Sequence, residues 1–214
     1  MQKTYTYIYE GNSYEVIITH KSSHRKSIRF RLRDGKFLIT APYLASNKYI
    51  MELVETKYGP RLIKQQKPLA VGDDFIYLFG NRYNYPSSGE FNFSSGEKIA
   101  YKNKEEFDKK IRKLFLKIII ARVRYYEGQM GLKNHNVRVR KMSTRYGSNS
   151  KKTGTVCFSL VLYHYSYPII DAIIVHELAH SIYFDHSKKF YEVVYKYCPN
   201  YKVLHTKLRK GEFL

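Results

Sequence analysis

Residues 169–182 of this 214-residue chain read IIDAIIVHELAHSI, and this stretch decides how the C-terminal half can fold. It is long and apolar enough for a buried helix, and within it His176, Glu177 and His180 form an H-E-x-x-H pattern. Residues four apart share one face of a helix, so both imidazoles can point at one metal ion while the carboxylate of Glu177 reaches a water bound to it. The stretch therefore predicts a metal-binding helix from about residue 168 to residue 183.

A third histidine, His186, follows six residues after His180. Three protein ligands would leave the fourth position of a zinc ion open for water, as catalysis requires. Tyr183 stands where a glycine would turn the chain most easily, and Asp185 can make that turn instead because aspartate tolerates unusual backbone angles. Asp185 itself, or Glu192 on the next helix, is the alternative third ligand.

The competing interpretation is that these histidines are ordinary core or surface residues. It explains Glu177 poorly, because a carboxylate buried among apolar side chains without a metal or a cation costs several kcal/mol or must take up a proton. We therefore expect zinc-assisted hydrolysis of a peptide bond, with Glu177 as the general base. Arg145, Tyr146 and Tyr183 are candidates for a second group that stabilises the oxyanion, and their spacing does not choose among them.

The net charge of +20, from 38 Lys plus Arg against 18 Asp plus Glu, indicates attraction to polyanions such as DNA or RNA. A solvated basic surface would explain the same charge. The alternative function is a basic nucleic-acid-binding protein whose zinc site is structural or vestigial, although Cys198, His205 and His164, the candidate fourth ligands, are all distant in sequence. A metal-dependent nuclease is disfavoured because such sites are rich in carboxylates. The basic clusters are Lys21–Arg33, Lys109–Arg124, Lys133–Lys141 and Lys202–Lys210.

No stretch of the sequence resembles a leader or a membrane span, because the longest apolar runs are short and interrupted by charge. We expect a cytoplasmic protein of unassigned oligomeric state. The two cysteines, Cys157 and Cys198, do not form a C-x-x-C pair and are expected to be packed small side chains rather than ligands.

The pattern of apolar residues predicts an α+β fold in two parts. Residues 1–102 form an antiparallel β-rich region, a meander of four strands that turns at Asp34-Gly35, followed by a helix capped near Ser46 and by short hairpins. Residues 103–214 form the metal-binding domain. Its expected elements are a helix over 104–130 that ends at Gly131, a strand over 136–142, two strand-like pieces within 143–162, the metal helix, and a second helix over 187–197 that packs on it through Phe190, Val193 and Val194.

Five segments give this sequence a resemblance to the YgjP-like metallopeptidase domain, a zincin-like zinc peptidase family related to SprT-like proteases. In order they are Arg145-Tyr-Gly-Ser-Asn-Ser150, Phe158-Ser-Leu-Val-Leu162, the run from His176 to His180, Asp185-His-Ser-Lys-Lys-Phe-Tyr191 and Pro199-Asn-Tyr201. The resemblance implies zinc ligands at His176, His180 and His186 and a catalytic base at Glu177. By analogy with SprT-like relatives, it also implies action on nucleic-acid-associated proteins.

The sequence departs from that family pattern at four positions. Tyr146 and Tyr191 replace tryptophans, Asn149 replaces a cysteine, and Phe158 replaces an asparagine. The tyrosines keep the bulk and flatness of the rings they replace. Asn149 and Phe158 instead change the polar contacts of the segment before the metal helix.

Overall fold

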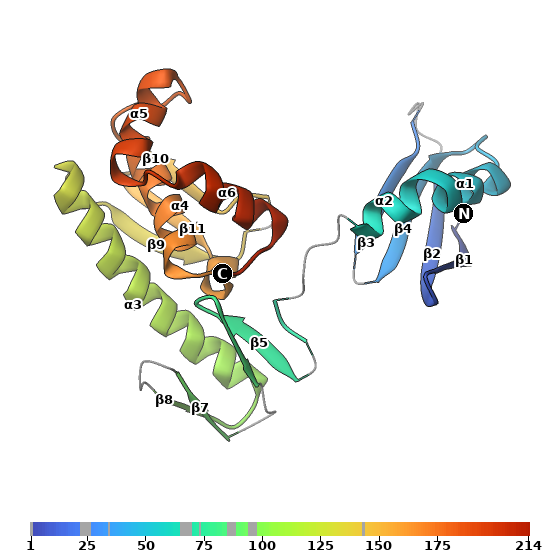
Figure 1. Ribbon diagram of the computed structural model, residues 1–214, viewed down its shortest axis with the longest axis horizontal. Helices are drawn as coiled ribbons and strands as arrows, with labels where there is room; N and C mark the ends of the chain where they lie inside the picture. Colours follow the sequence, from blue (N-terminus) through green and yellow to red (C-terminus); the bar gives the residue numbers. More distant parts are fainter. Residues whose placement is uncertain are drawn as a thin grey trace. The chain divides into compact units, whose positions relative to one another are not determined.

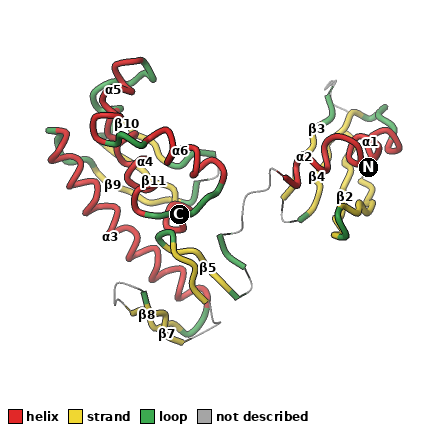
Figure 2. The backbone as a smooth tube through the Cα atoms, in the orientation of Figure 1, coloured by secondary structure: helices red, strands yellow, loops and turns green. Residues whose placement is uncertain are grey.

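The computed structural model describes residues 2–21, 27–33, 35–64, 70–72, 74–84, 89–93, 98–142 and 144–214 (Figure 1). The chain forms two compact units, Met1–Lys67 and Pro68–Leu214. Both contain helices and strands, which confirms the α+β class (Figure 2). Within the described residues, no helix is long and apolar enough to cross a membrane.

The first unit is a four-stranded sheet with a helical segment packed on one face. Its core contains Val16, Ile18, Phe37 and Ile39 from the sheet and Ile50 from the first helix. The elements are β1 (Gln2–Tyr9), β2 (Asn12–Lys21), β3 (Arg29–Arg33), β4 (Lys36–Pro42), α1 (Asn47–Leu53), the π-helical turn Val54–Tyr58 and α2 (Gly59–Lys64).

The expected antiparallel meander is wrong at one pairing in this sheet. The strand order is β1-β2-β4-β3, and β2 pairs with β4 in parallel. The parallel register places Val16 beside Phe37 and Ile18 beside Ile39, so the fully buried side chains of both strands fall on the same face. Burial of these pairs decides the strand order, which alternation within each strand does not specify.

The second unit holds the H-E-x-x-H helix. Its elements are β5 (Phe75–Leu78), β6 (Asn81–Asn84), β7 (Gly89–Asn92), β8 (Lys98–Tyr101), α3 (Lys104–Met130), β9 (Asn136–Arg140), β10 (Gly147–Ser150), β11 (Thr155–Ser159), the 3₁₀ turn Leu160–His164, α4 (Tyr167–Ala179), α5 (Lys188–Tyr197) and α6 (Tyr201–Lys210). Strands β9, β10 and β11 form a sheet of order β10-β11-β9, in which β10 is an edge strand. Helix α4 contacts α3, α5, α6 and β10.

The boundary between the compact units lies at residues 67 and 68, whereas the sequence placed a domain boundary after residue 102. The two hairpins between these positions belong to the core of the second unit. Phe79 and Phe91 from this segment pack in one cluster with Phe107 and Phe115 of α3. Short strands with few apolar residues of their own depend on this helix for burial.

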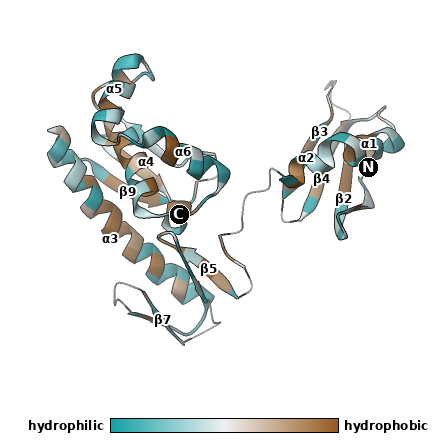
Figure 3. Cartoon of the chain, in the orientation of Figure 1, coloured by the Kyte–Doolittle hydropathy of each residue, from teal (hydrophilic) through white to brown (hydrophobic). Residues whose placement is uncertain are grey.

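Helix α3 begins and ends where the sequence predicts. The side chain of Asn103 accepts a hydrogen bond from the backbone N–H of Glu106 at 2.9 Å, and Gly131 closes the helix in the left-handed conformation with φ 65°. Five buried apolar residues recur at every fourth position, and Figure 3 shows apolar and polar residues alternating along the helix. These residues are Phe107, Ile111, Phe115, Ile119 and Val123.

Other expectations have mixed outcomes. Helix α5 packs on α4 through the buried Phe190 and Val194, as predicted, and both cysteines are buried and free. Helix α6 was not predicted. The basic segment 22–26, Asp34 of the first turn, Tyr85 of the hairpin and Ser143 lie outside the described residues.

Candidate metal centre

The metal helix α4 is buried on nearly all sides, because α3, α5, α6 and β10 all pack against it. It ends at Ala179, earlier than expected, and the chain then tightens. The N–H of Ser181 bonds to the carbonyl of Leu178 at 2.9 Å, three residues back instead of four. A bend at Phe184 and Asp185 then returns the chain, although Asp185 does not adopt a positive φ.

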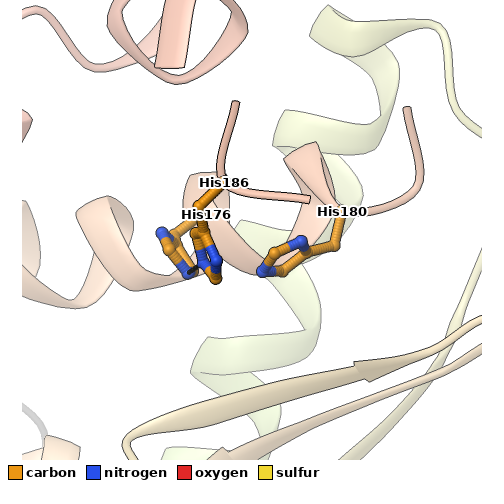
Figure 4. Close-up of side chains that lie close together, drawn as sticks. All are labelled: His176, His180 and His186. Atoms are coloured by element: carbon orange, nitrogen blue, oxygen red, sulfur yellow. Dashed lines mark hydrogen bonds between the residues drawn. The ribbon is translucent and has the colours of Figure 1, made fainter. Parts of the chain in front are cut away.

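This return brings the three histidines together. Their candidate ligand atoms all lie within 4.8 Å of one another, and Nε2 of His186 lies 3.4 Å from Nε2 of His176 (Figure 4). Two nitrogens bound tetrahedrally to one zinc ion at 2.0–2.1 Å would be about 3.3 Å apart, which is close to the observed separation. In the structure described here, neither Asp185 nor Glu192 joins this group, and Glu192 lies 4.0 Å from Lys188 instead.

The electrostatic environment favours the metal-binding, neutral form of His176 and His180. Burial, with the neighbouring His180, His186 and His205, lowers the pKa of His176 to about 3. Burial and His186 also lower the pKa of His180. A neutral imidazole has a free lone pair, whereas a protonated one has none. Three clustered imidazoles, two of them held neutral, are the ligands that a zinc ion prefers, and zinc binding explains their arrangement better than any other role.

Tyr201, the first residue of α6, orients His176. Its hydroxyl lies 2.9 Å from Nδ1 of His176, and the two rings stack with an angle of 11° between their planes. For Nε2 to bind a metal, Nδ1 must carry the ring proton and donate it to the Tyr201 oxygen. Burial raises the pKa of Tyr201, so the phenol stays protonated and neutral beside the site.

Glu177 lies on the inner side of the same helix, against strand β10. Its side chain is buried, and this burial raises the pKa of the carboxyl to about 8, with Arg145 opposing the shift. Gly147 makes room for it. A Cβ added to Gly147 would lie 2.5 Å from Oε1 of Glu177 and 2.6 Å from Cγ. A residue without a side chain at this point of β10 is therefore required for the carboxyl to occupy its place.

A cavity of about 480 Å³ joins these groups. Of the three candidates for an oxyanion-stabilising group, Arg145 and Tyr146 line it, and Tyr183 does not. His205 also lines the cavity and stacks on Tyr201, at 5.4 Å between ring centroids. The lining residues are Arg145, Tyr146, Gly147, Ser148, Asn149, Ile173, His176, Glu177, His180, Phe184, His186, Tyr201 and His205.

Sequence reasoning missed the parts of the site that α6 and β10 supply. Tyr201 and Gly147 both lie in segments that carry the family resemblance, but the sequence assigned them no role. Asn149 was noted only as a departure from the family pattern. In the structure its amide donates to the backbone carbonyl of Glu177 at 2.7 Å. Contacts that cross between a strand and a helix leave no periodic signal in the sequence.

A cavity that holds three clustered imidazoles beside a buried carboxyl is typical of the site of a metal-dependent hydrolase. The sequence matches the family YgjP-like, metallopeptidase domain, over residues 26–211, and the chain belongs to that family. No curated protein matches it.

Two solved structures show similarity to part of the chain. One is the metallopeptidase zymogen abylysin of Pyrococcus abyssi, with 22% identity and a TM-score of 0.40, covering 42% of this chain and 90% of that one. The other is the metallopeptidase zymogen jannalysin of Methanocaldococcus jannaschii, with 21% identity and a TM-score of 0.37, covering 42% of this chain and 96% of that one.

Proposed function

We propose that this protein is a zinc-dependent peptidase whose ligands are His176, His180 and His186 and whose general base is Glu177. The observation that carries the proposal is the common cavity, where three imidazoles lie within 4.8 Å of one another and the buried carboxyl of Glu177 lines the same wall. The zinc would supply a water of lowered pKa and would share the negative charge that develops on the carbonyl oxygen.

The side chains of the site then have distinct tasks. Glu177 in its ionised form takes the proton from the attacking water and passes it to the leaving amine. A bound cation would favour that ionised form, against the burial that raises the carboxyl pKa to about 8 in its absence. Arg145 is an exposed cation on the cavity wall and is the better placed candidate to stabilise the oxyanion, because Tyr146 already approaches the carbonyl of Leu208 at 3.4 Å.

The direct test compares the wild type with Glu177→Gln, both loaded with zinc, in the cleavage of an unstructured protein. The amide keeps the size of the side chain but does not accept the proton, so activity should fall by orders of magnitude while about one zinc per chain remains. Equal activity would exclude Glu177 as the base. A zinc-loaded wild type that cleaves no flexible protein would favour the alternative, a nucleic-acid-binding protein with a structural or vestigial zinc site.

A second candidate function, contact with nucleic acid, has one specific structural feature in its favour. A cavity of about 420 Å³ between β8 and α3 is lined by four lysines around an apolar floor. Lys98 and Lys110 pair with Glu90 and Glu106, whereas in the described part of the chain Lys113 and Lys117 have no ion pair. The lining residues are Lys98, Ile99, Ala100, Lys110, Lys113, Leu114 and Lys117.

Charge reversal tests this candidate. We expect the double variant Lys113→Glu with Lys117→Glu to bind single-stranded DNA more weakly. The slope of log affinity against log salt concentration should become less steep by about 2. The control is Lys48→Glu with Lys57→Glu in the first unit, which makes the same change in net charge. If both double variants weaken binding equally, only the overall charge matters. If neither does, the lysine-lined cavity does not contact nucleic acid.

A further inference from the structure

A chain of polar contacts links four segments of the second unit behind the metal centre. Asn149 on β10 contacts Ser181 just after α4, Ser181 contacts His135 just before β9, and His135 contacts Glu127 on α3. None of these residues is one of the clustered histidines. Glu127 is buried with only 1% of its surface exposed, and Arg124 of the same helix forms an ion pair with it. A buried carboxylate is retained only with good hydrogen-bond partners.

With a neutral His135 ring, the contacts have a single consistent direction. Glu127 accepts from the backbone N–H of His135 at 2.7 Å and lies 2.8 Å from its Nδ1, so Nδ1 carries the ring proton. Nε2 of His135 is then an acceptor for the hydroxyl of Ser181 at 2.8 Å. The Ser181 oxygen in turn accepts from the amide of Asn149 at 2.8 Å. Each donor therefore has an acceptor, and Glu127 fixes the direction of every hydrogen bond in this series.

The last residue of this hydrogen-bond series, Asn149, contacts the metal helix at the backbone of Glu177. In a regular helix the carbonyl of Glu177 would accept from the N–H of Ser181, but that N–H bonds to Leu178 instead. The carbonyl that is released accepts from the amide of Asn149 at 2.7 Å. Asn149 thus uses both of its amide hydrogens, one on the backbone of Glu177 and one on Ser181, beside His180. The tightened end of α4 is held against the edge strand at this point.

Ser181, His135 and Glu127 also have the order of contacts found in a serine hydrolase triad. Two observations argue against a nucleophilic Ser181. Its backbone N–H, which could help to stabilise an oxyanion, is bonded to Leu178, and its hydroxyl already receives a hydrogen bond from Asn149. Neither Ser181 nor His135 lines the cavity of the metal centre.

We propose that Asn149, held by Ser181, His135 and Glu127, is a positioning residue that fixes Glu177 and His180 relative to β10. The inference rests on the proposed peptidase function and adds to it a residue of the cavity lining that is not one of the clustered histidines. Asparagine stands here where the family pattern has a cysteine, and a thiol does not offer two strong N–H donors. In this chain the amide holds the end of α4 and the edge strand β10 together.

The test uses Asn149→Ala in the full-length, zinc-loaded protein, with Asn136→Ala as the control, because Asn136 is an exposed asparagine of the same sheet. We expect kcat for an unstructured protein substrate to fall about 10–100-fold with KM nearly unchanged, and zinc release to a chelator to become about tenfold faster. Both are measured well below the unfolding temperature, so that loss of fold does not contribute. Asn149→Asp, which keeps the shape and loses the donors, should behave in the same way.

A double variant tests whether the residues act as one unit. Asn149→Ala combined with Ser181→Ala should accelerate zinc release by less than the product of the two single effects. Wild-type rates in Asn149→Ala, independent effects of the two substitutions, or labelling of Ser181 by a fluorophosphonate would each overturn the proposal. Zinc release needs no substrate, so it decides the role of Asn149 even if the wild type proves to have no peptidase activity.

Discussion

Replacing Gly147 with alanine should displace Glu177, the proposed general base, without touching a proposed metal ligand. The new Cβ would lie 2.5 Å from Oε1 of Glu177, 2.6 Å from Cγ and 2.8 Å from Cδ. Restoring an ordinary contact of about 3.4 Å needs a shift of about 0.9 Å. The carboxyl must make most of that shift, because β10 is held by its ladder with β11. A misplacement of about 1 Å can cost about 100-fold in rate, so we expect kcat/KM to fall by about that factor.

The assay is cleavage of an unstructured fluorogenic protein by zinc-loaded Gly147→Ala, with zinc content measured on the same sample. Gly128→Ala is the matched control, because a Cβ at Gly128 in α3 meets no atom within 4 Å. Zinc should stay at about one per chain in both variants, and only Gly147→Ala should lose activity. Full activity in Gly147→Ala would refute the placement of Glu177 against β10, and loss of zinc would show that the strand supports the ligands rather than the base.

Three further predictions concern the surroundings of the site. Tyr201→Phe removes the hydroxyl 2.9 Å from Nδ1 of His176, and we expect zinc release to a chelator to become about tenfold faster, whereas an unchanged rate would mean that ring stacking alone orients His176. Burial lowers the pKa of His164 from 6.5 to about 4. The unfolded chain therefore binds more protons than the folded one between these pH values. The contribution of His164 to the free energy of unfolding is fully present above about pH 6.5, and it should fall by about 3 kcal/mol as the pH is lowered toward 4. Urea unfolding of His164→Gln should show a flatter pH profile, and identical profiles would contradict this. Asp171→Asn weakens the ion pair with Arg122 that joins α4 to α3, and the free energy of unfolding should drop by about 1–2 kcal/mol; an unchanged urea midpoint would show that the pair contributes nothing.

The parts of the structure that follow from local patterns could be predicted from the sequence. Helix α3 shows its apolar residues at every fourth position and ends at a glycine, so both its extent and its buried face were predictable. The spacing of His176 and His180 predicts one shared helix face, and the structure places both beside His186. These inferences succeeded because each depends on residues that are close together in the chain.

The parts that depend on contacts between distant segments were not predictable in this way. Strand β4 pairs in parallel with β2 because Phe37 and Ile39 bury beside Val16 and Ile18, and alternation within a strand does not reveal its partner. Tyr201 reaches His176 only because α6 packs across α4. Tertiary packing selects these partners among many that the local sequence allows equally well.

X-ray absorption spectroscopy of the zinc-loaded protein is the sharpest test of the proposed three-histidine zinc site, because it reports the atoms bound to the metal. We expect three imidazole nitrogens and one exchangeable oxygen at about 2.0–2.1 Å, which is the open coordination that hydrolysis needs. The signal should disappear with the metal in the variant His176→Ala with His180→Ala. A fourth protein ligand, such as a sulfur at about 2.3 Å, or zinc retained in full by the double variant, would contradict the assignment of a catalytic three-histidine centre.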